Sequence, residues 1–169
     1  SEDFADYTYP NVPEWWTFGG SWQVDDHEAK NTSTTSADLI TPLLNVSGTT
    51  DKITFKAARS SSYYTGSIAV AYSEDKKTWT TIDLGEFTLT TSYQTITVNG
   101  LAAGKYYLKI SGTRVKVDNF LGWERNPVME LDETVAPSLT DGTYDVKLNR
   151  TFQEGWNSLC LPFAVANIE

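Results

Sequence analysis

The sequence predicts an all-β fold: an antiparallel jelly-roll β-sandwich, followed by a linker and a C-terminal β-hairpin. Hydrophobic residues alternate with polar ones over much of the chain, and signals for helices are nearly absent. Turn residues separate the alternating runs at intervals of roughly 8–12 residues. Short alternating strands at that spacing are typical of sandwiches and jelly rolls.

The first part of the chain is the least regular. A loop rich in Pro, Gly and Trp precedes a short strand expected near residues 22–24, and Trp16 and Trp22 are expected to pack in the core. The polar stretch 25–38 shows no period and is expected to be a surface loop. Residues 38–48 are expected to form a strand broken by Pro42, which either lies at a sheet edge or bends there.

Five further runs alternate with period two and are separated by turn signals. They are residues 51–60 (DKITFKAARS), 66–73 (GSIAVAYS), 93–98 (YQTITV), 105–110 (KYYLKI) and 113–120 (TRVKVDNF). Alternation stops after Trp123. The domains predicted from this pattern are a sandwich over residues 1–125, a linker over 126–142 and a hairpin over 143–169, which we interpret as the truncated start of a second β-domain.

Composition excludes several classes of function. The 169-residue chain has a formal net charge of −9 and a pI of about 4.5, which disfavours nucleic acid and anionic membrane surfaces as partners. No apolar run reaches the ~18 residues that span a bilayer, so direct membrane insertion is not expected. Cys160 is the single cysteine, which excludes an intrachain disulfide and a cysteine-based zinc site.

Signals for catalysis are weak. His27 is the single histidine, it lies in the polar stretch, and no serine has the surroundings of a nucleophile elbow. A glycoside hydrolase needs only two carboxylates at a fixed separation, and 22 acidic residues leave that alternative open. Most of these acids lie in turns and in the linker, so we predict no catalytic residues.

Oxygen donors in the first and last segments of the predicted sandwich suggest a metal site. Asp118 and Asn119 interrupt the last strand, and Glu2 and Asp3 begin the chain. Calcium accepts carboxylate and amide oxygens, and first and last strands often meet in β-sandwiches. The alternative is a bend in which Asp118 and Asn119 cap backbone groups. Both interpretations predict the same backbone.

Aromatic residues in loops suggest a ligand surface. Trp15, Tyr63 and Tyr64 lie outside the alternating runs, and Arg59 is close to the two tyrosines in sequence. Flat rings suit the C–H faces of sugars, while Arg59 offers directional hydrogen bonds or cation–π contacts. These four residues are the candidate glycan-binding set. The alternative is that the rings only cover the ends of the sandwich.

Three segments resemble the cleaved-adhesin family, the jelly-roll modules of gingipain-type and "choice-of-anchor" surface proteins of Gram-negative bacteria. The segments are Leu-Ile-Thr-Pro at 39–42, the Tyr-x-x-x-Ile-x-Val-x-Tyr-Ser strand at 64–73 and the closing Val-Asp-Asn-Phe at 117–120. The resemblance covers roughly residues 1–124. It implies a galactose-binding-like sandwich, as in many carbohydrate-binding modules, and a structural calcium. In that case Asp118 matches the acid of the closing pair, and Glu2 or Asp3 matches the acidic start.

The predicted function is a non-catalytic, extracellular binding module of a bacterial surface protein, a carbohydrate-binding or adhesin module in the first place. Its expected partner is a glycan or a host or cell-surface protein, and it is expected to belong to a larger multidomain chain. Residues 148–163 resemble a segment that recurs in large surface proteins of the same bacteria, which supports a modular parent. The alternatives are a structural or protein–protein interaction module without a glycan site and, third, a glycoside hydrolase.

Overall fold

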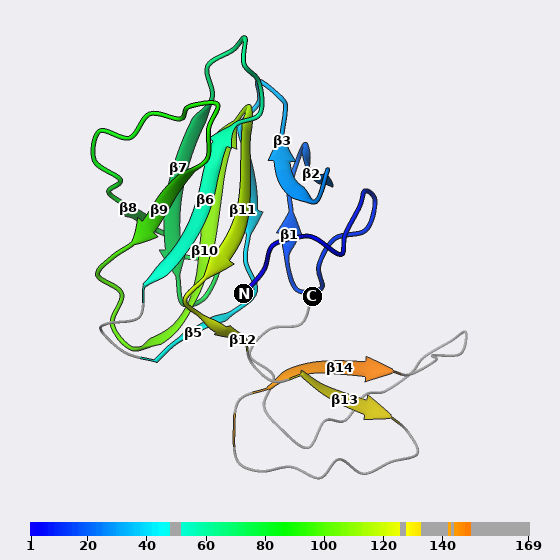
Figure 1. The fold of residues 1–169 in the computed structure, drawn as a ribbon. Helices are drawn as coiled ribbons and strands as arrows, with labels where there is room; N and C mark the ends of the chain where they lie inside the picture. Colours follow the sequence, from blue (N-terminus) through cyan, green and yellow to red (C-terminus); the bar gives the residue numbers. More distant parts are fainter. Residues whose placement is uncertain (48–51, 126–127, 133–141, 143, 150–169) are drawn as a thin grey trace. The chain divides into compact units, whose positions relative to one another are not determined.

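A computed structural model describes residues 1–47, 52–125, 128–132, 142 and 144–149 (Figure 1). Every regular element among these residues is a β-strand. The strands are β1 (Thr17–Phe18), β2 (Trp22–Asp25), β3 (Glu28–Asn31), β4 (Ala37–Ile40), β5 (Leu44–Val46), β6 (Ile53–Arg59), β7 (Ser67–Ser73), β8 (Thr80–Ile82), β9 (Gln94–Val98), β10 (Gly104–Thr113), β11 (Val115–Leu121), β12 (Glu124–Arg125), β13 (Val128–Asp132) and β14 (Asp145–Asn149). The chain divides into two units, Ser1–Asn126 and Pro127–Glu169.

The first unit consists of two antiparallel sheets. One has seven strands, with β1, β4, β10, β5 and β12 in order, β7 paired with β10, and β8 paired with β7. The other has five strands in the order β2, β3, β11, β6, β9. This arrangement confirms the predicted jelly-roll β-sandwich. In the described part of the chain there is no helix with the length and apolarity that crossing a bilayer requires.

The core lies between the sheets and follows the period-two pattern. Val115 and Val117 of β11 and Leu108 of β10 are fully buried. At one end of this core the Phe120 ring stacks on Phe55 with centroids 4.7 Å apart. A larger aromatic group closes around this pair, in which Trp16 and Phe4 also contact Phe120 edge to face. Burial of Trp16 and Trp22, at 7% and 4% exposure, confirms their predicted place in the core.

Pro42 bends a strand inside the sheet. The segments before and after it, β4 and β5, both pair with β10, and β1 and β12 flank them on the other side. At the bend, the Thr41 hydroxyl accepts a hydrogen bond from the Leu108 amide at 2.9 Å, and the Thr41 amide donates to the Leu108 carbonyl at 2.9 Å. Of the two alternatives for Pro42, the structure shows the bend.

The expected surface loop over residues 25–38 contains strand β3, which is a correction. Asp26 and His27 form a tight turn between β2 and β3, with positive φ angles of 51° and 62°. Such turns usually carry Asn or Gly, so this pair gives no hairpin signal. β3 buries only Ala29 and the polar Asn31, so its alternation is not hydrophobic. Asn31 is held there because its amide donates to the Gly112 carbonyl at 2.8 Å.

The second unit is described in part. β13 and β14 pair in parallel, with Glu130 opposite Lys147. The segment 126–142, expected as a linker, therefore contains β13, whose sequence Val-Met-Glu-Leu-Asp alternates over five residues. β14 is the first arm of the hairpin expected over 143–169. The second arm lies outside the described residues, so the hairpin stays a prediction.

Candidate functional site

One end of the sandwich is built from three loops and a turn that backbone hydrogen bonds tie together. The amide of Arg114 donates to the Ser33 carbonyl at 3.1 Å, and the amide of Ser60 donates to the Arg114 carbonyl at 2.9 Å. The amide of Arg59 donates to the Thr90 carbonyl at 2.7 Å. We call residues 32–36, 59–66, 88–92 and 113–114 the loop end. In Figure 1 the loop between β6 and β7 crosses the top of the sandwich.

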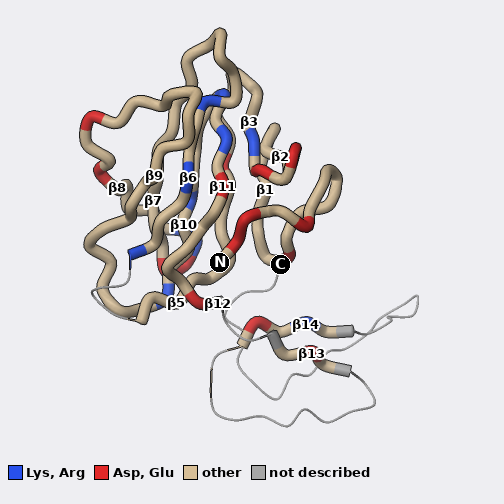
Figure 2. Tube along the Cα trace, viewed as in Figure 1, with Lys and Arg blue, Asp and Glu red and all other residues tan. Residues whose placement is uncertain are grey.

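The loop end differs in composition from the rest of the chain. Its residues are mostly Ser and Thr, and its only charged residues are Arg59 and Arg114. Figure 2 shows basic and no acidic positions where β6 ends and β11 begins. In a chain whose formal net charge is −9, this is a local patch of positive charge.

Arg59 emerges from the core at the loop end. It lies opposite the buried Val115 in the β6–β11 register, so it continues the inward-facing series of β6. Its Nε is buried without a hydrogen-bond partner, and its Nη1 donates weakly to the Tyr64 carbonyl at 3.5 Å. A long basic side chain can bury its stem in this way and keep its charged group near solvent.

Arg114 stacks on Tyr64. Its guanidinium carbon lies 3.9 Å from the centroid of the Tyr64 ring, a cation–π contact. The Tyr64 side chain remains 55% exposed, and Tyr63 beside it is 90% exposed. Within the described residues, neither Arg59 nor Arg114 forms an ion pair with a carboxylate. Two exposed rings and two guanidinium groups without an acidic partner therefore share this surface.

A glycine sets the position of the tyrosine loop. A Cβ on Gly66 would lie 2.5 Å from the Arg114 carbonyl oxygen and 2.9 Å from that of Thr113. Only glycine allows the loop to approach the β10–β11 turn this closely. The Ser67 and Thr113 hydroxyls add a hydrogen bond of 3.0 Å between the same two segments. The rings are thus presented by a braced loop.

The structure brings together three of the four predicted ligand-binding residues. Arg59, Tyr63 and Tyr64 all belong to the loop end. Trp15 belongs instead to the region around Phe120, because the adjacent residue Trp16 packs on the Phe120 ring. From Arg114 to Phe120, β11 advances about 20 Å at ~3.3 Å per residue, which separates Trp15 from the tyrosines. The Trp15 Nε1 is buried without a partner.

Arg114 was not predicted as part of the site. Its signal was present, because it directly follows the Ser-Gly-Thr turn that joins two alternating runs. Side chains at such turns lie at the end of a sandwich, and the loop after β6 was expected near an end too. What the sequence does not give is which loops meet there.

A second aromatic surface lies on the outer face of the seven-stranded sheet. Lys109 Nζ is 4.5 Å from the centroid of the Trp79 ring, and Lys76 Nζ is 4.8 Å from that of Tyr107. All four side chains are half-buried. Because it combines the same residue types away from the loop end, this surface offers matched control positions.

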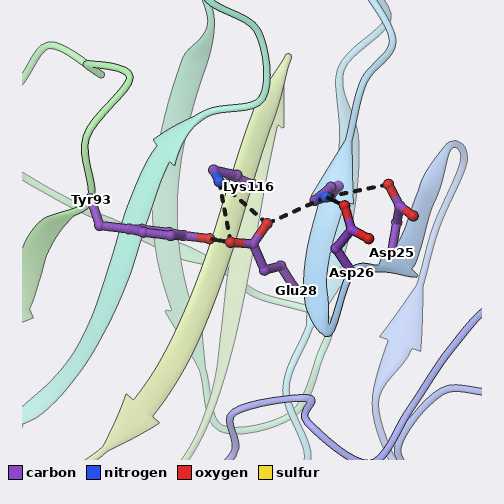
Figure 3. Close-up of polar contacts among 6 residues, drawn as sticks. Asp25, Asp26, Glu28, Tyr93 and Lys116 are labelled. Atoms are coloured by element: carbon purple, nitrogen blue, oxygen red, sulfur yellow. Dashed lines mark hydrogen bonds and ion pairs between the residues drawn. The ribbon is translucent and has the colours of Figure 1, made fainter.

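The outer face of the five-stranded sheet carries a dense set of charges centred on Glu28 (Figure 3). The Tyr93 hydroxyl donates a short hydrogen bond to Glu28, and Lys116 Nζ reaches the same carboxylate at 3.2 and 3.3 Å. Lys116 also lies 4.6 Å from the centroid of the Tyr93 ring. Lys30 bonds Glu28 at 3.3 Å and, from its other side, Asp25 and Asp26. We call these six residues the paired face.

Titration properties of the paired face follow from these contacts. Burial alone raises the pKa of Glu28, but the hydrogen bonds from Tyr93 and Lys116 outweigh it and lower the pKa below its usual value. Burial and the neighbouring Glu28 carboxylate raise the pKa of Tyr93. Glu28 is therefore an ionised acceptor near neutral pH, and the Tyr93 hydroxyl that donates to it remains protonated.

The predicted junction between the first and last segments is present. The Glu2 amide donates to the Phe120 carbonyl at 3.0 Å, and the Phe120 amide donates to the Glu2 carbonyl at 2.7 Å. Next to this bridge, Asn119 has a φ of 56° and the β11 register shifts after Asp118. Asp118 Oδ1 is buried without a hydrogen-bond partner. Burial, followed by repulsion from Glu28 and two N-terminal acids, raises the pKa of Asp118 to about 6.

The residues at this junction meet part of what a calcium site requires. The unpaired oxygen of Asp118 and the oxygen-only donor set suit a hard cation. The Glu2 carboxylate, however, accepts the Phe4 amide at 2.7 Å, and the Asp3 carboxylate accepts the Ala5 amide at 3.1 Å. In the described part of the chain, no three Asp, Glu, His or Cys side chains come close enough together to hold a metal. Calcium at Asp118 stays a prediction.

Comparisons with known proteins complete the description. No protein-family model and no curated protein sequence match the chain. Among solved structures, it is similar to a mutant of the family 29 carbohydrate-binding module CBM29-2, at 6% identity and a TM-score of 0.43 over 65% of this chain and 82% of that chain. It is also similar to a family two carbohydrate esterase from Cellvibrio japonicus, at 15% identity and a TM-score of 0.41 over 72% of this chain and 37% of that chain. The C-terminal CBM6 of LamC, a marine laminarinase from Zobellia galactanivorans, has 14% identity and a TM-score of 0.35 over 70% of this chain and 97% of that chain.

These overall likenesses are too distant to carry function, and a fold does not imply a function. The family resemblance noted in the sequence stays a prediction.

Proposed function

We propose that this chain is a non-catalytic carbohydrate-binding module that holds sugar rings at its loop end. The observation that carries the proposal is the pair of exposed rings, Tyr63 and Tyr64, presented on a braced loop beside Arg59 and Arg114. Tyr63, at 90% exposure, has no packing role that would explain its place.

The chemistry of the loop end suits a sugar. Tyrosine rings offer flat apolar area to the C–H faces of a pyranose at a small entropic cost. Serine and threonine hydroxyls, which make up most of the surrounding loops, both donate and accept hydrogen bonds, as sugar hydroxyls require. The close approach at Gly66 fixes the rings before a ligand arrives, which lowers the cost of binding.

The wider setting is also part of the proposal. We place the module outside the cell, as an adhesin-type unit of a larger bacterial surface protein, on the basis of the three segments that resemble cleaved-adhesin modules. A structural calcium at Asp118 belongs to the same proposal, supported by the buried unpaired oxygen of that carboxylate.

A glycan array tests the binding function. The chain should give hits that are lost in Tyr64→Ala and kept in Tyr107→Ala, a matched tyrosine under a lysine on the seven-stranded sheet. Both variants should melt as the parent chain does, because neither ring belongs to the core. Hits lost instead in Tyr107→Ala would move the site to that sheet. A blank array across plant, host and microbial glycans would remove the function and favour a protein partner, since exposed Tyr and Arg also form protein–protein hot spots.

A further inference from the structure

We propose that the loop end selects acidic sugars: the ligand carries a carboxylate or sulfate group that binds Arg59 and Arg114 while its ring lies against Tyr64. This inference rests on the proposed function and names the class of glycan. Its basis is that neither arginine has a carboxylate partner within the described residues, together with the contact that each makes with Tyr64.

The arginines converge on a single residue. Arg59 reaches the backbone carbonyl of Tyr64 at 3.5 Å, and Arg114 covers its ring at 3.9 Å. Each guanidinium group thus contacts a different part of Tyr64, one its backbone carbonyl and the other its ring. Guanidinium groups present rigid forks of N–H donors that match carboxylate and sulfate oxygens in pairs. A sugar ring on Tyr64 would place an acidic substituent within reach of both forks.

The surroundings supply no competing acid. The loops at this end contain no Asp or Glu, although the whole chain has 22 acidic residues against 13 basic ones. Arg59 Nε is a buried donor without an acceptor, and the guanidinium group that carries it has no carboxylate partner within the described residues. Neutral sugars would leave both positive charges without a counter-charge.

Elsewhere the molecule shows what a carboxylate does among the same groups. On the paired face, Glu28 accepts hydrogen bonds from Tyr93 and Lys116, while Lys116 also lies over the Tyr93 ring. The loop end repeats the stacked cation and tyrosine, in Arg114 over Tyr64, and lacks the acid. The ligand's acidic group would complete the same set of contacts from outside.

Because the chain has a net charge of −9, long-range attraction does not account for binding of an acidic glycan. A chain with this charge repels polyanions at long range, so binding of an acidic polymer requires local contacts. The affinity for an acidic glycan should fall as salt is added, because screening weakens charge-assisted contacts at an exposed site.

A matched pair of polymers tests the inference by calorimetry: polygalacturonate and the same polymer with its carboxyl groups methyl-esterified. A second pair, dextran sulfate and dextran, distinguishes sulfate from carboxylate as the recognised group. Polyacrylate, an anion without sugar rings, controls for charge alone. We expect at least one acidic glycan to bind about tenfold or more tightly than its neutral partner, in line with one or two charge-assisted hydrogen bonds.

Variants locate the effect. Arg114→Gln and Arg59→Gln should each lower affinity for the acidic glycan about tenfold to a hundredfold, and so narrow the difference in affinity between the acidic glycan and its neutral partner. Lys109→Gln, which removes a stacked cation from the seven-stranded sheet, should change neither. Melting curves establish that each variant is folded, and Arg59→Lys keeps the charge while removing the fork, so it should recover only part of the affinity.

The outcomes separate the two proposals. Equal binding of a neutral polymer and its acidic partner overturns the acidic selectivity and leaves the carbohydrate-binding function standing. Polyacrylate binding as tightly as the acidic glycan also overturns it, since charge alone would then suffice. No binding to any of these polymers overturns the acidic selectivity, while the carbohydrate-binding function is decided by the glycan array. Affinity that survives both arginine variants removes the assigned site.

Discussion

The loop end and the paired face contain similar groups and differ in whether the charges are paired. On the paired face, Lys116 lies over the Tyr93 ring and Glu28 binds both. At the loop end, Arg114 lies over the Tyr64 ring and no carboxylate is present. Groups that satisfy one another within the chain contribute to folding. Groups that remain unsatisfied cost stability and are available to a ligand.

This contrast predicts that substitutions at the paired face change stability and those at the loop end change binding. Unfolding by urea at pH 7 gives the free energy of unfolding for all of them, with the slope of the transition as a check that the unfolded state is unaffected.

Glu28→Gln should have the largest effect. The change keeps the shape of the side chain and removes the charge that Tyr93, Lys116 and Lys30 share, leaving two part-buried lysines without their central partner. We expect a loss of about 2 kcal/mol. Asp26→Asn is the matched control: its carboxylate is exposed and binds Lys30 alone, so the loss should stay below about 0.5 kcal/mol. Equal losses in the two variants would show that Glu28 does not organise this face.

The fold was largely readable from the sequence because period-two alternation reports burial directly. β10 buries every second residue from Tyr106 to Gly112, and β6 does so from Ile53 to Ala57. β3 was not predicted because its buried residues are Ala29 and Asn31, one small and one polar, so the strand has no hydrophobic alternation. Asn31 can be buried there only through contacts such as the one with Gly112, 81 residues away, which no local pattern shows.

The next largest change in the free energy of unfolding is expected at Tyr93, with Tyr64 as its matched comparison. Tyr93→Phe removes the hydroxyl that donates to Glu28 and should cost about 1 to 1.5 kcal/mol, as expected for a hydrogen bond to a charged acceptor. Tyr64→Phe removes a hydroxyl from an exposed ring and should change stability by less than about 0.5 kcal/mol. A comparable loss in Tyr64→Phe would mean that the loop end contributes to folding through that hydroxyl, and the contrast would fail.

Asp118 is the exception on the five-stranded sheet, because its Oδ1 has no partner. Its pKa of about 6 lies above that of the unfolded chain, so the folded state retains a proton that the unfolded state releases. The free energy of unfolding should therefore fall as pH rises from about 4 to 6, by on the order of 1 kcal/mol after solvent screening is allowed for. Asp118→Asn should remove this fall and be more stable than the parent chain at pH 7.

Calcium bound at Asp118 would change this pH dependence of stability. A bound cation would favour the ionised carboxylate, so added calcium should raise the melting temperature at pH 7 and cancel the fall in stability between pH 4 and 6. Chelator should reverse both effects, and Asp118→Asn should not respond. An unchanged melting temperature across millimolar calcium would remove the metal and leave Asp118 as an unpaired acid.

The candidate site was only partly readable from the sequence. Tyr63 and Tyr64 were visible because aromatic residues in a loop break the alternating pattern. Arg114 was not predicted and Trp15 was grouped with the tyrosines because the sequence does not show which loops and turns meet at one end of the sandwich. Tyr93 and Glu28 are 65 residues apart in sequence, so no local pattern predicts the hydrogen bond between them.

Arg59→Met should have the smallest effect on stability and gives the sharpest test of the contrast. Methionine keeps the apolar stem that continues the inward series of β6 and removes a buried Nε that has no acceptor. Loss of an unsatisfied donor offsets loss of the weak bond to Tyr64, so stability should change by no more than about 0.5 kcal/mol. The matched change Lys116→Met removes a lysine that is paired with Glu28 and should cost about 1 kcal/mol. If Arg59→Met costs as much as Lys116→Met, Arg59 serves the fold, and an acidic ligand would no longer be needed to explain its place at the loop end.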